Sequence, residues 1–198
     1  MTDKPIPAIL EYIPYRKRDL TRPRDEQNYG YLAGHGYAGV RVDIRGTGDS
    51  EGVLKDEYLP QELEDGVELI RWIAAQPWCN GSVGMIGISW GGFNGLQIAA
   101  LQPPALKAVI SIASTADRYN DDIHYKGGCL LNENLGWGAT MWSYSSRAPD
   151  PDLRPDWREM WRNRLKNEPF LPSTWLRHQR RDSYWQPGPE TEGYDRIK

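Results

Sequence analysis

The segment Gly87-Ile88-Ser89-Trp90-Gly91 is the part of this sequence whose residue types and spacing could do chemistry, because it fits the pattern G-x-S-x-G. A serine in this pattern lies on a tight turn between a strand and a helix, where the strained backbone requires small residues two positions away. The serine then stands at a helix N-terminus, whose free N–H groups can hold an oxyanion. The pattern predicts a nucleophilic serine; the alternative is a glycine-rich turn that carries an idle one.

The segments on either side of the motif have the patterns that such a turn needs. Residues 82–88 form an apolar run flanked by glycines, which predicts a buried strand. Residues 92–102 predict a helix, which two prolines at positions 103 and 104 bring to an end. The expected strand–turn–helix context is therefore present around Ser89.

The rest of the first 117 residues alternates between the same two patterns. Strands are predicted at 7–13, 37–44 and 107–113, and helices at 23–33 and 61–76. In the second of these helices the apolar residues fall on one face at helical spacing: Leu63, Val67, Ile70 and Ala74. Alternating strands and helices indicate βαβ units, so we predict an α/β fold with a mainly parallel sheet and helices on both faces.

The pattern changes after about residue 116. No further strand is predicted there, and helices are expected at 153–167 and 173–183, with proline-rich joints between them. Six of the nine tryptophans lie between Trp137 and Trp185. The sequence thus predicts two regions: a partial α/β core over 1–117 and a mostly helical region over 118–198.

Composition excludes several classes of protein. The 24 basic and 27 acidic residues give a net charge of −3, which argues against a nucleic-acid partner. No run approaches the ~18 apolar residues of a membrane span, and the N-terminus MTDKPIP has no apolar run of a signal peptide, so we expect a cytoplasmic protein. Two cysteines cannot build a disulfide framework, and no set of His, Asp and Glu has metal-ligand spacing, so we expect no metal and no cofactor.

Two glycine-rich segments resemble nucleotide-binding motifs and are set aside. Residues 34–39 satisfy G-x-G-x-x-G, but they end a predicted helix and open a strand, the reverse of the dinucleotide-binding arrangement. Residues 45–52, RGTGDSEG, follow a strand but lack the Lys-Ser/Thr pair of a phosphate-binding loop.

Five stretches of the chain, in order, resemble the CocE/NonD hydrolases, relatives of the X-Pro dipeptidyl-peptidase (S15) family within the α/β-hydrolase superfamily. They are EYIPYRKRD, VDIRGTGDSEG, GISWGGFNGLQIAA, DDIHYKGGCLLNENLGWGATMW and LRHQRRDSYW. The resemblance implies an α/β-hydrolase core and a helical cap over the carboxyl edge of the sheet. It also implies a serine hydrolase that acts on esters or amides without a cofactor.

Three site residues follow from this resemblance. Ser89 matches the nucleophile, and the backbone N–H of Trp90 matches one oxyanion donor. Tyr15, in IPYRKRD, matches the tyrosine whose hydroxyl supplies the second donor. Taken without the resemblance, the residues favour an ordinary tyrosine that anchors a loop.

The acid and the base of the triad are harder to place. In this fold they follow the serine in the order Asp or Glu, then His, on loops after later strands. Only one strand is predicted after Ser89, so we expect these residues to lie beyond position 198 and the chain to be a fragment that also lacks the first strands. Within the chain only His124 and His178 follow Ser89, and a structural role is expected for both.

The entry to the cap carries an acidic cluster. His124, Asp121 and Asp122 are candidate substrate-binding residues, and with Asp117 the two aspartates could bind a substrate amine; an exposed acidic loop is the alternative.

The resulting hypothesis is a serine hydrolase that cleaves small ester, amide or peptide substrates through an acyl-enzyme on Ser89. The alternatives are an X-Pro dipeptidyl-peptidase and a non-catalytic binding protein with the same fold. The oligomeric state is not predicted.

Overall fold

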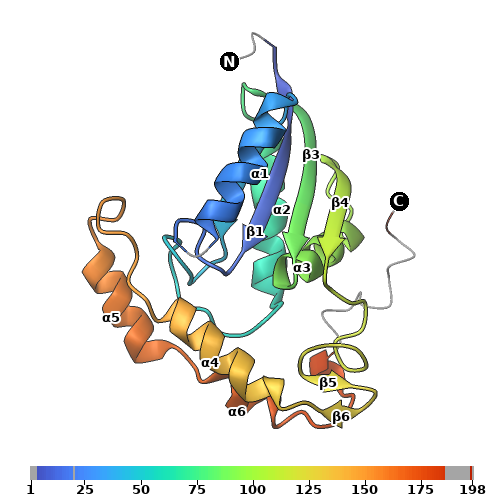
Figure 1. The fold of residues 1–198 in the computed structure, drawn as a ribbon, viewed down its shortest axis with the longest axis vertical. Helices are drawn as coiled ribbons and strands as arrows, with labels where there is room; N and C mark the ends of the chain where they lie inside the picture. The colour runs from blue at the N-terminus through green and yellow to red at the C-terminus, as the bar shows by residue number, and fades with distance from the viewer. Residues whose placement is uncertain (1–3, 20, 186–196, 198) are drawn as a thin grey trace.

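A computed structural model describes residues 4–19, 21–185 and 197. Its centre is a four-stranded sheet in which every neighbouring pair is parallel, with strand order β2-β1-β3-β4 (Figure 1). The strands are β1 (Ile6–Ile13), β2 (Ala38–Asp43), β3 (Cys79–Ile88) and β4 (Leu106–Ile112). The predicted α/β fold with a mainly parallel sheet is therefore confirmed, and the four strands expected from apolar runs are all present.

Helices cover both faces of the sheet, as right-handed crossovers require. They are α1 (Arg22–Gly34), α2 (Pro60–Ala74) and α3 (Trp90–Ala100), with α1 on one face and α2 and α3 on the other (Figure 1). Two successive residues of β1 point to opposite faces of the sheet, because side chains alternate along a strand. The Glu11 carboxylate meets Arg24 of α1 at 2.8 Å, whereas the Tyr12 hydroxyl donates to the backbone of Glu62 in α2.

The apolar stripe of α2 packs against the sheet as predicted. Leu63 and Ile70 are buried, and Val67 and Ala74 are partly buried against the same core. A Cβ at Gly66 would lie 2.4 Å from the Cδ1 of Ile98 in α3, so glycine is needed for the close approach of the two helices. Ile98 lies near the C-terminal end of α3, and Trp90, the first residue of the helix after Ser89, is also fully buried.

The region after residue 117 differs from expectation in two ways. A short antiparallel hairpin, β5 (Tyr125–Lys126) and β6 (Cys129–Leu130), is present where no strand was predicted. Gly127 and Gly128 both have positive φ, 56° and 81°, which suits a two-residue hairpin turn. The helix α4 (Glu133–Ser145) was also missed, because its two glycines and aromatic residues give it low helix propensity, and packing of buried residues such as Met141 stabilises it instead.

The remaining helices are shorter than predicted. The helix predicted over 153–167 is α5 (Trp157–Asn167), which begins only after Pro155. In place of the helix predicted over 173–183 there are α6 (Leu171–Trp175) and a 3₁₀ turn at Ser183–Trp185. We call the described residues 118–185 the cap; its helices lie at the end of the sheet toward which β3 and β4 point (Figure 1).

Buried arginines attach the cap to loops that follow β1 and β2. Arg164 of α5, which is fully buried, donates to the carbonyl oxygens of Gly48 at 2.9 Å and Ser50 at 2.6 Å. Arg16, just after β1, donates to the carbonyl oxygen of Ala148 at 2.8 Å. Hydrogen bonds to charged groups contribute about 1.5–3 kcal/mol each. The cap is thus fixed over the carboxyl end of the sheet, beside the turn that carries Ser89.

Candidate active site

Ser89 lies at the turn between β3 and α3 in a strained conformation. Its φ is 52° and its ψ is −117°, a region that non-glycine residues rarely adopt. Its N–H still donates to the carbonyl oxygen of Ile112 at 2.8 Å, so the strand pairing continues up to the serine itself. The chain then enters α3 at once, and the half-buried Ser89 stands at the helix N-terminus.

The glycines two positions away make this turn sterically possible. A Cβ on Gly87 would lie 2.3 Å from the carbonyl carbon and oxygen of Gly91, closer than any real side chain permits. A Cβ on Gly91 would lie 2.8 Å from the Cγ2 of Ile13. The helix therefore folds back directly over the end of its own strand, and the small residues of the G-x-S-x-G pattern have the steric role predicted for them.

The backbone N–H of Trp90 points out of the helix toward Tyr15. The N–H groups of Gly92 and Phe93 donate to the carbonyl oxygen of Ser89, at 2.8 Å and 3.0 Å, and so belong to the first helical turn. The N–H of Trp90 instead donates to the hydroxyl oxygen of Tyr15 at 3.0 Å. Tyr15 follows β1, the strand next to β3, which explains how residues 75 positions apart meet here.

The phenol of Tyr15 is neutral at physiological pH. Burial raises its pKa to about 12, against hydrogen bonds with the Ser89 side chain and the Trp90 N–H that favour the phenolate. A neutral hydroxyl keeps its proton and can donate it in a hydrogen bond. The structure therefore brings Ser89, the Trp90 N–H and the Tyr15 hydroxyl together; their roles as nucleophile and oxyanion donors stay a prediction.

An aromatic residue of the cap packs beside this group. The ring of Trp137, in α4, meets the ring of Tyr15 edge-on at 6.3 Å between centroids. The Trp137 indole N–H donates to Oε1 of Glu57 at 2.6 Å, which holds the ring in place. The sequence analysis noted the tryptophan-rich cap but did not connect any tryptophan to Tyr15.

Glu62 lies directly beneath the turn and was not identified from the sequence. Its buried carboxylate accepts hydrogen bonds from the Trp90 indole and from the Asn94 side chain at Oε1, and from the Tyr58 N–H at Oε2. Burial raises the pKa of Glu62 to about 7. A signal was present: Glu62 falls on the buried face of α2, and a carboxylate there requires polar partners inside the protein.

His124 is a buried residue whose ring lies between Asn134 and Glu57. The side chain is fully buried, with Nδ1 on Asn134 Oδ1 and Nε2 on Glu57 Oε2, both at 2.8 Å. Arg118 contacts the same Glu57 oxygen at 2.6 Å. Burial acts to raise the pKa of Glu57, but His124 and Arg118 outweigh it and lower that pKa to about 2. Burial also acts to lower the pKa of His124, but the attraction of Glu57 is stronger and leaves that pKa raised. Both ring nitrogens are therefore occupied.

The aspartates near the cap entry each have partners within the chain. Asp121 is exposed and pairs with Lys126 at 3.0 Å. Asp122 is largely buried 3.9 Å from Arg118, and burial raises its pKa. Asp117 accepts N–H groups of the following turn and pairs with Arg181. Binding of a substrate amine by Asp121 and Asp122 therefore stays a prediction.

The other two histidines lie away from the turn that carries Ser89. His35 follows α1 and precedes β2, at the amino end of the strands, where its Nδ1 is 2.9 Å from the carbonyl oxygen of Tyr31. His178 lies in the cap with Nδ1 2.8 Å from the Asp182 carboxylate. Together with His124 these are all the histidines of the chain, and in the structure each has another partner.

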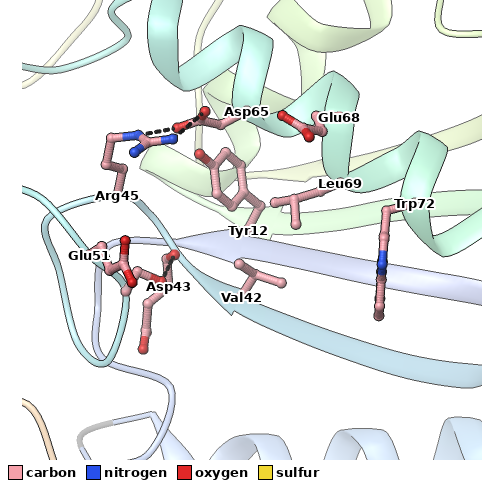
Figure 2. A pocket seen from close by; sticks show the side chains of 10 residues that line it. Tyr12, Val42, Asp43, Arg45, Glu51, Asp65, Glu68, Leu69 and Trp72 are labelled. Carbon is pink, nitrogen blue, oxygen red and sulfur yellow. Dashed lines mark hydrogen bonds and ion pairs between the residues drawn. The ribbon is translucent and has the colours of Figure 1, made fainter. Parts of the chain in front are cut away.

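A separate cavity of about 500 Å³ lies between β2, the edge strand, and α2 (Figure 2). Its lining includes Val42, Leu69 and the half-exposed ring of Trp72, and an ion pair between Arg45 and Asp65 lies at its rim. Ser89 and Tyr15 do not line it, so we do not assign it to the candidate site.

Among the described residues no group of His, Cys, Asp and Glu could hold a metal ion, and none of the described helices has the length and apolar character of a membrane span.

A strained serine between a strand and a helix of a parallel sheet, with a cap at the carboxyl end, defines the α/β-hydrolase class of fold. Comparison with known proteins makes this more specific. The family model described as X-Pro dipeptidyl-peptidase (S15 family) matches residues 1–198, and the chain belongs to this family.

Sequence relatives agree with this membership, and solved structures share the fold. The chain is 34% identical over 160 residues to a cocaine esterase from Rhodococcus sp., which covers 78% of this chain and 27% of the relative. A CocE/NonD family hydrolase from Staphylococcus aureus has the same fold, with a TM-score of 0.72 at 22% identity over 94% of this chain and 33% of that one. The chain thus spans only 19 to 27% of the length of the first curated relatives it matches.

Proposed function

We propose that this chain carries the nucleophile and the oxyanion donors of a serine hydrolase that cleaves ester or amide bonds. The observation that carries the proposal is the 3.0 Å hydrogen bond between the Trp90 N–H and the Tyr15 hydroxyl, beside a serine with a φ of 52°. Two donors that converge next to a strained nucleophile are the arrangement that stabilises a tetrahedral oxyanion. A glycine-rich turn with an idle serine has no need of either donor.

In the proposed reaction the Ser89 Oγ attacks the substrate carbonyl carbon while a base takes the hydroxyl proton. The carbonyl oxygen becomes an oxyanion and accepts hydrogen bonds from the Trp90 N–H and the Tyr15 hydroxyl. Collapse of this intermediate expels an alcohol or amine, which takes up the proton and leaves an acyl-serine. Water then attacks the acyl-serine in the same way and releases the acid. The oxyanion takes the place of the Trp90–Tyr15 hydrogen bond, so both donors are retained.

The base of this reaction is not one of the histidines of this chain. Both ring nitrogens of His124 are occupied, and His35 and His178 have other partners. We therefore propose that polypeptide outside the 198 residues supplies the base and its acid partner. The much greater length of the relatives supports this proposal.

The substrate class remains a choice between two related activities. The cocaine esterase relative supports ester cleavage, and the family description supports release of X-Pro dipeptides, which is the second candidate function. Both use the same acyl-enzyme chemistry at Ser89. We propose a small ester, amide or peptide substrate rather than a nucleic acid, in keeping with the net charge of −3, and a cytoplasmic location that cell fractionation would check.

The test is covalent labelling by a fluorophosphonate probe of the protein expressed from its natural reading frame. Peptide mass spectrometry should locate the label on Ser89, and Ser89→Ala should abolish it. Ser143→Ala is the matched control, because Ser143 is an exposed serine on α4 and should leave labelling unchanged. Absence of labelling at Ser89 in the complete protein would refute the hydrolase and favour a non-catalytic binding protein.

A further inference from the structure

Glu62 joins the parts of the structure that hold the two proposed oxyanion donors. Its Oε1 accepts from the indole Nε1 of Trp90 at 2.8 Å and from Nδ2 of Asn94 at 3.1 Å. The same Asn94 nitrogen donates to the carbonyl oxygen of Tyr12 at 3.0 Å, at the end of β1 and three residues before Tyr15. One carboxylate thus connects α2, the first turn of α3 and the end of β1.

All the direct partners of this carboxylate are donors. The third, the N–H of Tyr58, reaches Oε2 at 3.0 Å from a residue with a φ of 54°, and the Tyr58 ring packs on Trp90 at 5.2 Å. Only an ionised carboxylate accepts on both oxygens without presenting a hydrogen. A proton on Glu62, or an amide in its place, would put a donor against a donor and leave a buried polar group unsatisfied.

From this geometry we infer that Glu62 is a positioning residue, whose ionised carboxylate fixes the Trp90 N–H relative to the Tyr15 hydroxyl. The inference rests on the proposed function, because it assigns Glu62 to the oxyanion donors. Glu62 touches no substrate in this account; it acts through the indole of Trp90 and through the Asn94–Tyr12 bond. Its protonation should loosen both links and move the donors away from the geometry that the oxyanion requires.

The surroundings of Glu62 place this protonation in a testable range. Burial raises its pKa to about 7, and the nearby Glu57 carboxylate acts in the same direction. The phenols of Tyr12 and Tyr15 interact electrostatically with it, and the Arg45–Asp65 pair lies beyond Tyr12. Tyr58 contacts it through its backbone N–H, while Arg118 lies over the Tyr58 phenol ring. Those phenols all have raised pKa values and stay neutral near pH 7, so they do not titrate in the same range.

The first test is a pH titration, from pH 5 to 9, of the ¹⁵N-tryptophan signals of the protein from its natural reading frame. The indole and backbone N–H signals of Trp90, assigned with Trp90→Phe, should shift together in a one-proton transition near pH 7. Glu62→Gln should remove the transition, whereas Glu64→Gln, at an exposed position on the same helix, should keep it. A wild-type chain without the transition, or a transition that persists in Glu62→Gln, would overturn the inference. The wild-type result decides even if Glu62→Gln does not fold.

The second test separates this inference from the proposed function. In the protein from the natural reading frame, Glu62→Gln should lower kcat for a p-nitrophenyl ester by roughly 10²-fold with little change in KM, because a displacement of about 1 Å in catalytic geometry has that effect. If Ser89→Ala abolishes turnover but Glu62→Gln retains wild-type kcat, the inference alone fails. If Ser89→Ala retains turnover, the proposed function fails, and the titration of Trp90 still reports on the carboxylate.

Discussion

Replacing Gly87 by alanine tests the geometry of the turn more directly than any change to Ser89. The new Cβ would lie 2.3 Å from the carbonyl carbon and oxygen of Gly91 and 2.8 Å from its Cα. These atoms belong to the backbone of α3, so no side chain can rotate away to make room. Gly84 offers a matched control in the same strand, because a Cβ there would meet its nearest atom, the carbonyl oxygen of Ala108, at 3.7 Å.

The size of the effect follows from these distances. Carbon atoms pack best at about 3.5–4 Å, so the start of α3 must recede by roughly 1 Å to accept the methyl group. Overpacking of this kind costs about 1–3 kcal/mol. Gly84→Ala should instead be neutral or stabilising by up to about 1 kcal/mol, because alanine reduces the entropy of the unfolded chain without a clash.

Two measurements check this prediction. Urea unfolding followed by tryptophan fluorescence should show Gly87→Ala about 1–3 kcal/mol less stable than the wild type. In the protein from the natural reading frame, fluorophosphonate labelling of Ser89 should fall by roughly 10²-fold, since the receding helix carries the Trp90 N–H with it. Equal stability and equal labelling of Gly87→Ala and Gly84→Ala would refute the steric account of the turn.

Three further predictions concern the base, the second oxyanion donor and the ion pairs of the cap. The 198-residue chain alone should hydrolyse p-nitrophenyl acetate close to the buffer rate, because loss of a triad member typically removes several orders of magnitude; substantial turnover that His124→Ala or His178→Ala abolishes would show that the base lies inside it. Tyr15→Phe in the protein from the natural reading frame should lower kcat by about 10²–10³-fold with KM little changed, and wild-type kcat would exclude the hydroxyl as a donor. The folded pKa of Glu57 is lowered from 4.5 to about 2, so its contribution to stability is present above pH 4.5 and is lost as pH falls toward 2. That of His124 is raised above 6.5, so its contribution is full below pH 6.5 and is lost as pH rises through the folded pKa. Urea midpoints measured across pH 2–9 should therefore fall as the pH drops below 4.5 and again as it rises through the folded pKa of His124. A midpoint that does not change below pH 4.5 would contradict the ion-pair account.

Local patterns in the sequence were sufficient for most of the core. Apolar runs identify β1 to β4, and the apolar stripe at helical spacing identifies α2. Burial on both sides does not extend to every strand, because β4 lies at the edge of the sheet and its Ile110 and Ile112 are exposed. The turn at Ser89 was also readable, since a Cβ on Gly87 would clash with Gly91 inside the same five-residue motif, although the need for glycine at 91 itself comes from Ile13 of β1. The cap was less readable, because α4 depends on packing rather than on its own propensity.

Contacts between distant residues were decided only by the tertiary structure. The bond between Trp90 and Tyr15 spans 75 positions, that between Trp90 and Glu62 spans 28, and that between His124 and Glu57 spans 67. No periodicity within one element specifies such pairs, because they form only when the parallel register of β1 and β3, the placement of α2 and the packing of the cap bring distant segments together. Whether a buried carboxylate is a costly isolated charge or a positioned acceptor therefore depends on which donors the folded chain places around it.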